Sequence, residues 1–531
     1  MSLAQSIRST AAAVPEKEAL VFGGERLSYS DLDLGSDAMA YFLSGLDLKI
    51  GDRVGILMPN CTDNVLVFLA VLKIGGIEVN INPDMPTNTI IQAFKQAEIT
   101  VLVGAKTPVE KMRSIIRACP EIRHVILEGR LLEEIGSPDL VALEDMHRKQ
   151  AAPYPAVSID TDPALIQYTS GTTGQPKGVT LSQGSFISAS KARQQALELD
   201  ETARILNILR LSHSCSKSLL FDALITGATL VLAKGFVPPS GFLKTLREEN
   251  ISLITGPPFL FHQLLKLRNR KDVVNRLRSS LKYLEIGMAG APPGLFHELR
   301  AAFPWASIIN RYGVTENAGA ASMMIHGPGD AMIGVGACGR SAPGAPMEIS
   351  RADRTDTSAD GLSEVRIKGP AVMIGYWEDL KRGHAPVYQK TGFDTGDLVD
   401  IDAEGRLFIA GRKDDMIQVA GERVAPKTIE DVVLQLHGIR EAVVLGIEDK
   451  IFGHRIALCY YSDGINCDET VLEHCRKHLP PYMVPHVLTA CRQALPKNAA
   501  GKISRQALRK QVQRGTLTAG LLQGDPVDTR N

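Results

Sequence analysis

Short runs of Val, Ile and Leu alternate with helix-like segments along much of this chain, and this alternation limits the folds it can adopt. One series runs through residues 53–58, 64–74 and 78–82, and another includes residues 229–232 and 251–256. Apolar runs of this length are typical of strands that are buried on both faces, and such strands form parallel sheets covered by helices. The pattern therefore predicts an α/β fold built on parallel sheets.

The pattern changes twice toward the C-terminus. Glycines and prolines become frequent from about residue 334, and the strands there look short and alternating, which predicts a smaller β-rich unit. After Asp414 the expected elements are two helices with strands between them. We therefore expect a large N-terminal region of residues 1–413 and a small, mobile α+β lid of residues 414–531.

The charges of the chain balance, since 59 basic residues match 59 acidic ones. This balance argues against nucleic acid as a partner. The longest apolar run, residues 65–72, is far shorter than the ~18 residues that cross a bilayer, and the N-terminus lacks the apolar stretch of a secretory signal. The eight cysteines include no Cys-x-x-Cys pair, which is typical of a reducing compartment. We expect a cytoplasmic protein with no membrane span.

The segment YTSGTTGQPKGVT, residues 168–180, is the most informative in the chain. It gathers glycines, hydroxyl side chains and Lys177 in one loop after an apolar stretch. Small residues let consecutive backbone N–H groups converge on an anion, while the hydroxyl groups add donors and the lysine adds a charge. The segment is not a Walker A loop, because Pro176 precedes the lysine and Gly178 follows it. It predicts a polyphosphate site, and the alternative is a Ser/Thr/Gly turn without a ligand.

Four further segments follow this loop, and the five together resemble the acyl-adenylate-forming superfamily. They are GMAGAPPG at residues 287–294, NRYGVTEN at 310–317, TGFDTGDLVDIDAEGRLFIAGRKDDMIQVAGERVAP at 391–426 and LPKNAAGKISR at 495–505. The superfamily includes acyl- and aryl-CoA synthetases, peptide-synthetase adenylation domains and firefly luciferase. One motif could arise by chance, but five in the family's order are specific.

The resemblance implies a reaction in two steps that uses ATP and Mg²⁺. A carboxylate attacks the α-phosphate of ATP to give acyl-AMP and pyrophosphate, and a thiol then displaces AMP. Because the first step brings an anion against a polyanion, its catalysis depends on positioning and charge stabilisation. The expected substrates are a small-molecule carboxylic acid and, as the thiol, either CoA or the phosphopantetheine of a carrier protein.

The resemblance also assigns roles to individual residues. The implied catalytic set is Lys502, Thr315, Glu316 and His213. In this set Glu316 would be the metal ligand for Mg²⁺, and Lys502 would reach the carboxylate and the α-phosphate during adenylation only. The residues implied to bind ATP or AMP are Thr169, Ser170, Gly171, Thr172, Thr173, Gly174, Lys177, Gly290, Ala291, Pro292, Tyr312, Asp397 and Arg412.

Within the nucleotide-binding set, the phosphate loop would hold the β- and γ-phosphates, and the GMAGAPPG segment would line the adenine edge. Tyr312 would lie against the base, while Asp397 would accept the ribose hydroxyls with help from Arg412. Asp414 stands at the hinge about which the lid of such enzymes rotates after the first step. Gly421 stands where the family has a glycine beside the thiol tunnel. Glycine has no side chain, so it would leave room for the thiol there.

The region of the expected acid pocket departs from the family pattern. Where the family often has Pro-Leu-Phe-His-x-x-Gly, this chain has LRLSHSCSKSLL, with His213 in the histidine position. Polar residues such as Ser212, Ser216 and Lys217 would suit an oxygenated, aromatic or dicarboxylic acid. We favour the alternative, in which Lys217 points to solvent and the pocket is apolar.

These observations predict a carboxylic acid–CoA ligase that forms acyl-AMP. One alternative is an enzyme that stops at acyl-AMP or passes it to a carrier protein or a partner enzyme. Another is a non-catalytic nucleotide-binding protein, and the intact Lys502, Glu316 and Asp397 argue against it, because binding alone does not require a lysine that acts in the transition state. The sequence leaves open which acid is used and the oligomeric state, a homodimer included.

Overall fold

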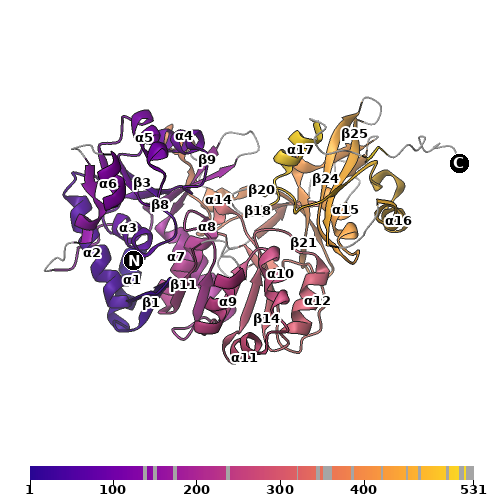
Figure 1. Cartoon of the computed structure of the whole chain (residues 1–531), viewed down its shortest axis with the longest axis horizontal. Helices are drawn as coiled ribbons and strands as arrows, with labels where there is room; N and C mark the ends of the chain where they lie inside the picture. Colours follow the sequence, from indigo (N-terminus) through magenta and orange to yellow (C-terminus); the bar gives the residue numbers. More distant parts are fainter. Residues whose placement is uncertain are drawn as a thin grey trace.

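The computed structural model shows a body that holds most of the chain and a smaller C-terminal part, which lies at the upper right in Figure 1. The structure describes residues 1–135, 140–147, 152–170, 176–234, 239–319, 321–341, 347–350, 362–383, 388–419, 422–449, 453–463, 468–497, 502–513 and 520–521. Every structural statement below concerns these residues.

The first sheet of the body has its strands in the order β19-β9-β8-β4-β3-β5-β6-β7. They are β3 (Arg53–Leu57), β4 (Ile77–Asn80), β5 (Val101–Gly104), β6 (His124–Leu127), β7 (Leu140–Ala142), β8 (Pro163–Ser170), β9 (Pro176–Ser182) and β19 (Gly375–Tyr376). Strands β3 to β8 run parallel, whereas β9 and β19 are antiparallel additions at one edge. Every residue of β4 and β5 is buried, as expected for parallel strands covered on both faces.

The second sheet has its strands in the order β16-β15-β14-β13-β12-β10-β11-β1-β2. They are β1 (Glu18–Phe22), β2 (Glu25–Ser28), β10 (Arg204–Asn207), β11 (Thr229–Leu232), β12 (Leu253–Gly256), β13 (Tyr283–Ile286), β14 (Ser307–Tyr312), β15 (Ser322–His326) and β16 (Arg340–Ser341). The central strands of this sheet are also parallel. Ligands of such sheets bind beyond the carboxyl ends of the strands, so the loops after β12, β13 and β14 are the first place to look for a site.

Helices cover both sheets and also fill the space between them. The central layer contains α1 (Leu3–Ala13), α2 (Tyr29–Ser44), α3 (Thr62–Lys73), α7 (Gln183–Leu197) and α8 (Ser214–Thr226). The outer face of the first sheet is covered by α4 (Thr87–Ala97), α5 (Val109–Ala118) and α6 (Gly129–Ile135), and that of the second by α9 (Pro239–Glu248), α10 (Pro258–Lys266), α11 (Lys271–Ser280) and α12 (Pro293–Ala302). The α/β fold with parallel sheets that the sequence predicts is confirmed.

A smaller antiparallel sheet follows, in the order β17-β18-β20-β21. Its strands are β17 (Met347–Ser350), β18 (Ser363–Ile367), β20 (Phe393–Ile401) and β21 (Leu407–Arg412), and the short helices α13 (Trp377–Lys381) and α14 (Tyr388–Thr391) lie between β18 and β20 in sequence. This sheet is the β-rich unit expected after residue 334.

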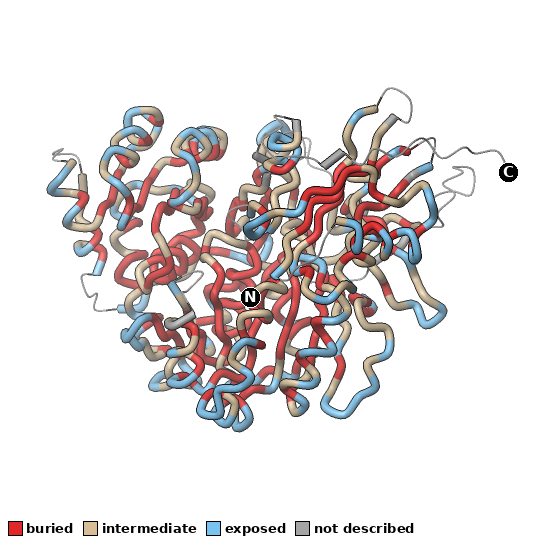
Figure 2. The backbone as a smooth tube through the Cα atoms, turned by 45° about the vertical axis from the view of Figure 1, so that its right-hand side comes forward, coloured by how far each residue is buried: buried red, intermediate tan, exposed pale blue. Residues whose placement is uncertain are grey.

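The C-terminal part has a sheet of its own and its own apolar core. It contains β22 (Ile417–Val419), β23 (Glu422–Val424), α15 (Pro426–Val433), β24 (Ile439–Asp449), β25 (Gly453–Ser462), α16 (Asp468–His478), β26 (Val487–Cys491), α17 (Arg505–Gln513) and β27 (Gly520–Leu521). Its two clusters of buried apolar residues lie between residues 417 and 508, whereas the clusters of the body end at residue 407. Figure 2 shows these buried segments as red tubes in both parts. We call this C-terminal part the lid.

Candidate active site

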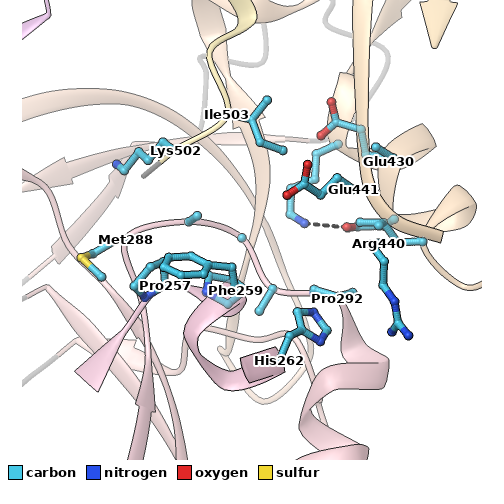
Figure 3. A pocket seen from close by; sticks show the side chains of 18 of the residues that line it. Pro257, Phe259, His262, Met288, Pro292, Glu430, Arg440, Glu441, Lys502 and Ile503 are labelled. Atoms are coloured by element: carbon cyan, nitrogen blue, oxygen red, sulfur yellow. Dashed lines mark hydrogen bonds and ion pairs between the residues drawn. The ribbon is translucent and has the colours of Figure 1, made fainter. Parts of the chain in front are cut away.

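A cavity of about 1000 Å³ lies where the lid faces the carboxyl ends of β12, β13 and β14. The body contributes the loops that follow these three strands, together with α10 and parts of β20 and β21. The lid contributes α15, parts of β24 and β25, and the segment around Lys502 (Figure 3). Several residues of the predicted site line this cavity, namely Gly290, Ala291, Pro292, Tyr312, Asp397, Arg412 and Lys502.

The expected phosphate loop joins β8 to β9, which form an antiparallel pair with Thr169 opposite Lys177. Gly171, Thr172, Thr173 and Gly174 lie outside the described residues, and so does the side chain of Ser170. The Lys177 amino group lies 5.3 Å from the centre of the Tyr376 ring. A Cβ at Gly178 would come within 2.9 Å of the Ile166 side chain, so any other residue here would force its neighbours to shift.

The adenine-edge segment begins after β13, and Pro292 is the N-cap residue of α12. Gly290 lies close to the lid, because a Cβ built on it would stand 3.3 Å from the Lys427 amino group. Lys427 itself pairs with Asp431 on α15, at 2.7 Å. The loop from the body and the first turn of α15 therefore meet at one wall of the cavity.

A hydrogen-bonded group of three residues forms the next part of the wall. The Tyr312 hydroxyl donates to Asp397 Oδ2 at 2.6 Å, and Arg412 Nη1 donates to Asp397 Oδ1 at 3.2 Å. Asp397 and Arg412 face each other on β20 and β21, where they are paired in register. Burial raises the pKa of Tyr312, and the Asp397 carboxylate raises it further, so the phenol stays protonated. These contacts fix the Asp397 carboxylate in place as an acceptor.

Thr315 and Glu316 lie in a short 3-10 turn that follows β14. Tyr376 donates a hydrogen bond to Glu316 Oε1 at 3.2 Å, and the backbone oxygen of Glu316 accepts from the backbone N–H of Met373 at 2.7 Å. Burial raises the pKa of the Glu316 carboxyl. A carboxylate in this environment gains from a nearby cation, which would offset its loss of hydration.

His213 caps the N-terminus of α8, because its Nδ1 accepts a hydrogen bond from the backbone N–H of Cys215 at 3.2 Å. A neutral ring that accepts at Nδ1 has its proton on Nε2. Burial lowers the pKa of His213 to about 4, and the positive charges of Lys502 and Arg311 contribute to the shift. The next residue, Ser214, places its hydroxyl 3.4 Å from the hydroxyl of Thr315. The start of α8 therefore presents a neutral imidazole beside the Thr315 turn.

Lys502 enters the cavity from the lid, on a segment that forms a bridge between Lys497 and Ile503. The side chain keeps contact with the solvent of the cavity, but the surrounding protein lowers the pKa of its ammonium group. The negative charge of Asp397 opposes this shift only in part. Lys497 pairs with Glu441 at 2.7 Å, and its amino group lies 5.3 Å from the centre of the Phe259 ring in the body.

One expectation about the acid pocket is wrong, because Lys217 does not point to solvent. It is fully buried on α8, where its amino group pairs with Glu78 on β4 at 2.6 Å and lies 3.6 Å from the centre of the Phe68 ring. A buried ammonium group needs such a partner, since the loss of hydration would otherwise be too costly. The sequence signal for Glu78 was a single carboxylate within an apolar strand, which indicates a buried charge but not its partner.

A second buried network escaped the sequence analysis. Arg193 on α7 pairs with Glu285 on β13 and, at 3.0 Å, with Asp222 on α8. Arg311 on β14 lies 3.6 Å from Glu285. A charged residue in each of several apolar elements was the signal available, since such residues are rarely buried without partners.

The predicted hinge and thiol residues lie beside the lid. Asp414 is part of a 3-10 turn, Lys413–Asp415, between β21 and β22, and Gly421 lies outside the described residues. No group of three or more His, Cys, Asp or Glu side chains in the described part of the chain could hold a metal ion. Among the same residues, no helix is both long and apolar enough to cross a membrane.

The comparisons with known proteins identify the family of the chain. The chain belongs to the AMP-binding enzyme family, which it matches over residues 7–377, and residues 428–502 match the C-terminal domain of AMP-binding enzymes. The family and the class of enzyme predicted from the motifs are thereby confirmed.

Relatives with known names cover nearly the whole chain. A long-chain-fatty-acid–CoA ligase from Yersinia pestis is 29% identical over 98% of this chain and 96% of its own length. A mitochondrial medium-chain acyl-CoA ligase from Mus musculus is 27% identical over 96% of this chain and 88% of its own length.

Solved structures of CoA ligases share the fold. An anthranilate–CoA ligase in complex with anthranoyl-AMP superposes with a TM-score of 0.85 at 23% identity, covering 97% of this chain and 98% of the other. The O-succinylbenzoate–coenzyme A synthetase from Bacillus subtilis in complex with AMP gives a TM-score of 0.79 at 24% identity. The match covers 95% of this chain and 98% of the other.

Proposed function

We propose that this chain is an AMP-forming acid–CoA ligase that converts a carboxylic acid to acyl-AMP and then to acyl-CoA. The observation that supports this proposal most strongly is the meeting of Lys502 from the lid with Tyr312, Asp397 and Arg412 from the body in one cavity. A lysine carried by a lid that is proposed to move suits a step of catalysis better than simple binding.

In the proposed complex with ATP, the Asp397 carboxylate accepts hydrogen bonds from the ribose hydroxyls, and Tyr312 lies against the base. Gly290, Ala291 and Pro292 follow the adenine edge. The loop that contains Thr169 to Gly174 and Lys177 holds the β- and γ-phosphates and the departing pyrophosphate. Because Tyr312 and Arg412 already hold Asp397, nucleotide binding needs little rearrangement there.

In the first step, an oxygen of the acid attacks the α-phosphorus, and the bond to the bridging oxygen of the β-phosphate breaks. Lys502 donates to the carboxylate and to an α-phosphate oxygen, which reduces the repulsion between the two anions. Thr315 contacts the α-phosphate. His213 is neutral and carries its proton on Nε2, so it would donate a hydrogen bond to the reacting carboxylate without removing the charge of that group.

Mg²⁺ fits this site through Glu316. The buried carboxyl of Glu316 has a raised pKa, and a hard cation with oxygen ligands would stabilise its ionised form. Mg²⁺ usually takes few protein ligands and completes its shell with phosphate oxygens and water, so one carboxylate suffices. When bound, the ion would neutralise part of the charge on the phosphates.

In the second step, the sulfur of CoA attacks the carbonyl carbon of acyl-AMP, and AMP leaves. We propose that the lid, residues 414–531, rotates at Asp414 for this step, so that Lys502 withdraws and Gly421 lies beside the thiol. The separate apolar cores of body and lid support such a motion, because neither core has to open. A homodimer and a cytoplasmic location stay predictions from the sequence.

The first test replaces Lys502 with alanine. The Lys502→Ala variant should lose at least about 100-fold in acid-dependent exchange of pyrophosphate into ATP, because an electrostatic donor of this kind contributes that much to the rate. Binding of ATP, measured by calorimetry, should change little. Lys510→Ala, which removes an exposed lysine of α17, is the matched control and should keep the wild-type exchange rate. Exchange that survives in Lys502→Ala would contradict the role of the lysine.

The acceptor is tested by mass spectrometry of a reaction with CoA present. Acyl-CoA and AMP should accumulate. Acyl-AMP alone would instead favour an enzyme that stops at the adenylate or serves a carrier protein. The absence of acid-dependent exchange over a broad panel of acids would favour a non-catalytic nucleotide-binding protein.

A further inference from the structure

Met288 has a backbone conformation that a residue with a side chain rarely adopts. Its φ is +65°, in the left-handed region, and it lies two residues beyond the end of β13. Glu98 and Glu198 share this conformation, but they close helices, where a left-handed residue is common. Met288 closes no helix, so its strained backbone requires another explanation.

The position of Met288 in the cavity suggests that explanation. In Figure 3 its thioether lies on the same side of the cavity as the Lys502 amino group, whereas Pro292 and His262 lie on the other side. Pro292 belongs to the proposed adenine edge, and Lys502 is proposed to contact the reacting carboxylate. Met288 therefore lies where the rest of the acid would extend.

The surroundings of Met288 favour a small acid. Met288, Pro257 and Phe259 form an apolar wall of the cavity, and Met288 packs against the apolar cluster between the second sheet and α9–α12. On the other face of the same strands, Glu285 and Arg311 are buried among ionised partners. A long hydrocarbon chain that continued into that layer would have to separate charged groups from their partners, which is unfavourable.

We propose that Met288 sets the size limit for the acid and that the enzyme takes a compact acid, either a short aliphatic acid or one with a single ring. This inference rests on the proposed ligase function. An unbranched thioether can fill an irregular space against a small substrate, and the left-handed backbone directs it there. Glycine would adopt the same backbone without strain but would leave the space empty.

Three variants separate the volume of the side chain from the strain of the backbone. Met288→Gly removes both, Met288→Ala removes most of the volume but keeps a Cβ in the left-handed region, and Met288→Leu keeps the volume. Each is compared with the wild type for kcat/KM in ATP–pyrophosphate exchange, with benzoate against 2-naphthoate and butanoate against dodecanoate. Thermal unfolding of each variant is measured in parallel.

The wild type should prefer the smaller acid of each pair. Met288→Ala and Met288→Gly should shift the preference toward the larger acid by at least about tenfold, the effect of one or two methylene groups in an apolar pocket. Met288→Leu should keep the wild-type preference. Met288→Gly should unfold on the order of 1–3 °C above Met288→Ala, because only glycine relieves the strain.

The possible results are distinguishable. Exchange in the wild type with an unchanged preference in both small variants would overturn the role of Met288. An equal wild-type rate with both members of each pair would overturn the size limit. Lack of exchange with every acid in the wild type and all variants would overturn the proposed function itself, and this inference with it. Equal unfolding of the Gly and Ala variants would overturn the assignment of strain.

Discussion

The charged residues beneath the site and those of the lid differ in how completely they are buried. In the body, the side chains of Arg193, Asp222 and Glu285 are at most 2% exposed. In the lid, the pair of Lys497 and Glu441 is 30% and 14% exposed. The body therefore holds its charges in a fixed arrangement under the site, whereas the pair on the lid keeps contact with water.

This difference matches what each region has to do. Charges that stabilise a transition state are most effective when they are fixed in advance, because no reorganisation is then needed during the step. The proposed rotation of the lid would separate its contacts with the body in every cycle, and the contact of the partly exposed Lys497 with Phe259 is cheap to separate. Burial raises the pKa of Asp222 to about 6, and the charge of Arg193 opposes that shift. The buried charged groups of the body therefore depend on one another for stability, whereas the Lys497–Glu441 pair of the lid is stabilised in part by water.

The largest effect is expected when one partner of the buried network loses its charge. Glu285→Gln should lower the free energy of unfolding by about 3–5 kcal/mol, because Arg193 and Arg311 then remain buried without their shared carboxylate. Urea unfolding followed by circular dichroism measures this change. The matched control is Asp272→Asn, which breaks the exposed pair with Arg247 and should cost far less, because exposed ion pairs contribute little to stability. Equal losses in the two variants would remove the contrast between buried and exposed charges.

A smaller effect is expected from the protonation of Lys502. The surrounding protein lowers the pKa of this lysine below its ordinary value, so its positive charge is lost at a lower pH than for an exposed lysine. Because the charged form is proposed to assist the first step, the rate of ATP–pyrophosphate exchange should fall as the pH rises through that pKa, about tenfold per pH unit. His213, whose pKa is about 4, stays neutral throughout this range and should not contribute.

Lys502→Arg tests this assignment, because a guanidinium group stays protonated at any accessible pH. The variant should be slower than the wild type, but its exchange rate should not show the alkaline fall. The same fall in both proteins would assign the titration to another group.

The smallest effect is expected at the contact between Lys497 of the lid and Phe259 of the body. Lys497→Ala removes this contact and the pair with Glu441, both of which are partly hydrated. The free energy of unfolding, obtained from the shift in the midpoint of thermal unfolding, should fall by no more than ~1 kcal/mol. Lys497→Arg, which keeps the charge, is the control. A loss as large as that of Glu285→Gln would show that the lid is held as tightly as the body.

The sequence alone predicted the framework of the molecule. The runs at residues 53–58 and 251–256 form β3 and β12, and the expected helix at residues 64–74 corresponds to α3. These elements depend on local apolar periodicity, which a sequence displays directly. The motifs also led to several of the residues that meet in the cavity, among them Gly290, Tyr312, Asp397 and Lys502.

The sequence did not reveal which charged residues pair in the interior. Glu78 and Lys217 are 139 positions apart, and Arg193 and Glu285 are 92 positions apart. Nothing in local periodicity reports on a partner at such a distance, so Lys217 was expected to face solvent. The strained backbone of Met288 was equally hidden, since left-handed conformations are predicted mainly at glycine and asparagine.

The separate core of the lid has a consequence for limited proteolysis of this protein and for exchange of its lid with that of a relative. Val424, Ile429 and Leu458 are buried within the lid, in a cluster that shares no residue with those of the body. A protease that cuts near the 3-10 turn at Lys413–Asp415 should therefore release two fragments that each remain compact. The same modularity would let a related chain donate its lid to this body, which would exchange the proposed roles of Lys502 and Gly421 together and leave the body unchanged.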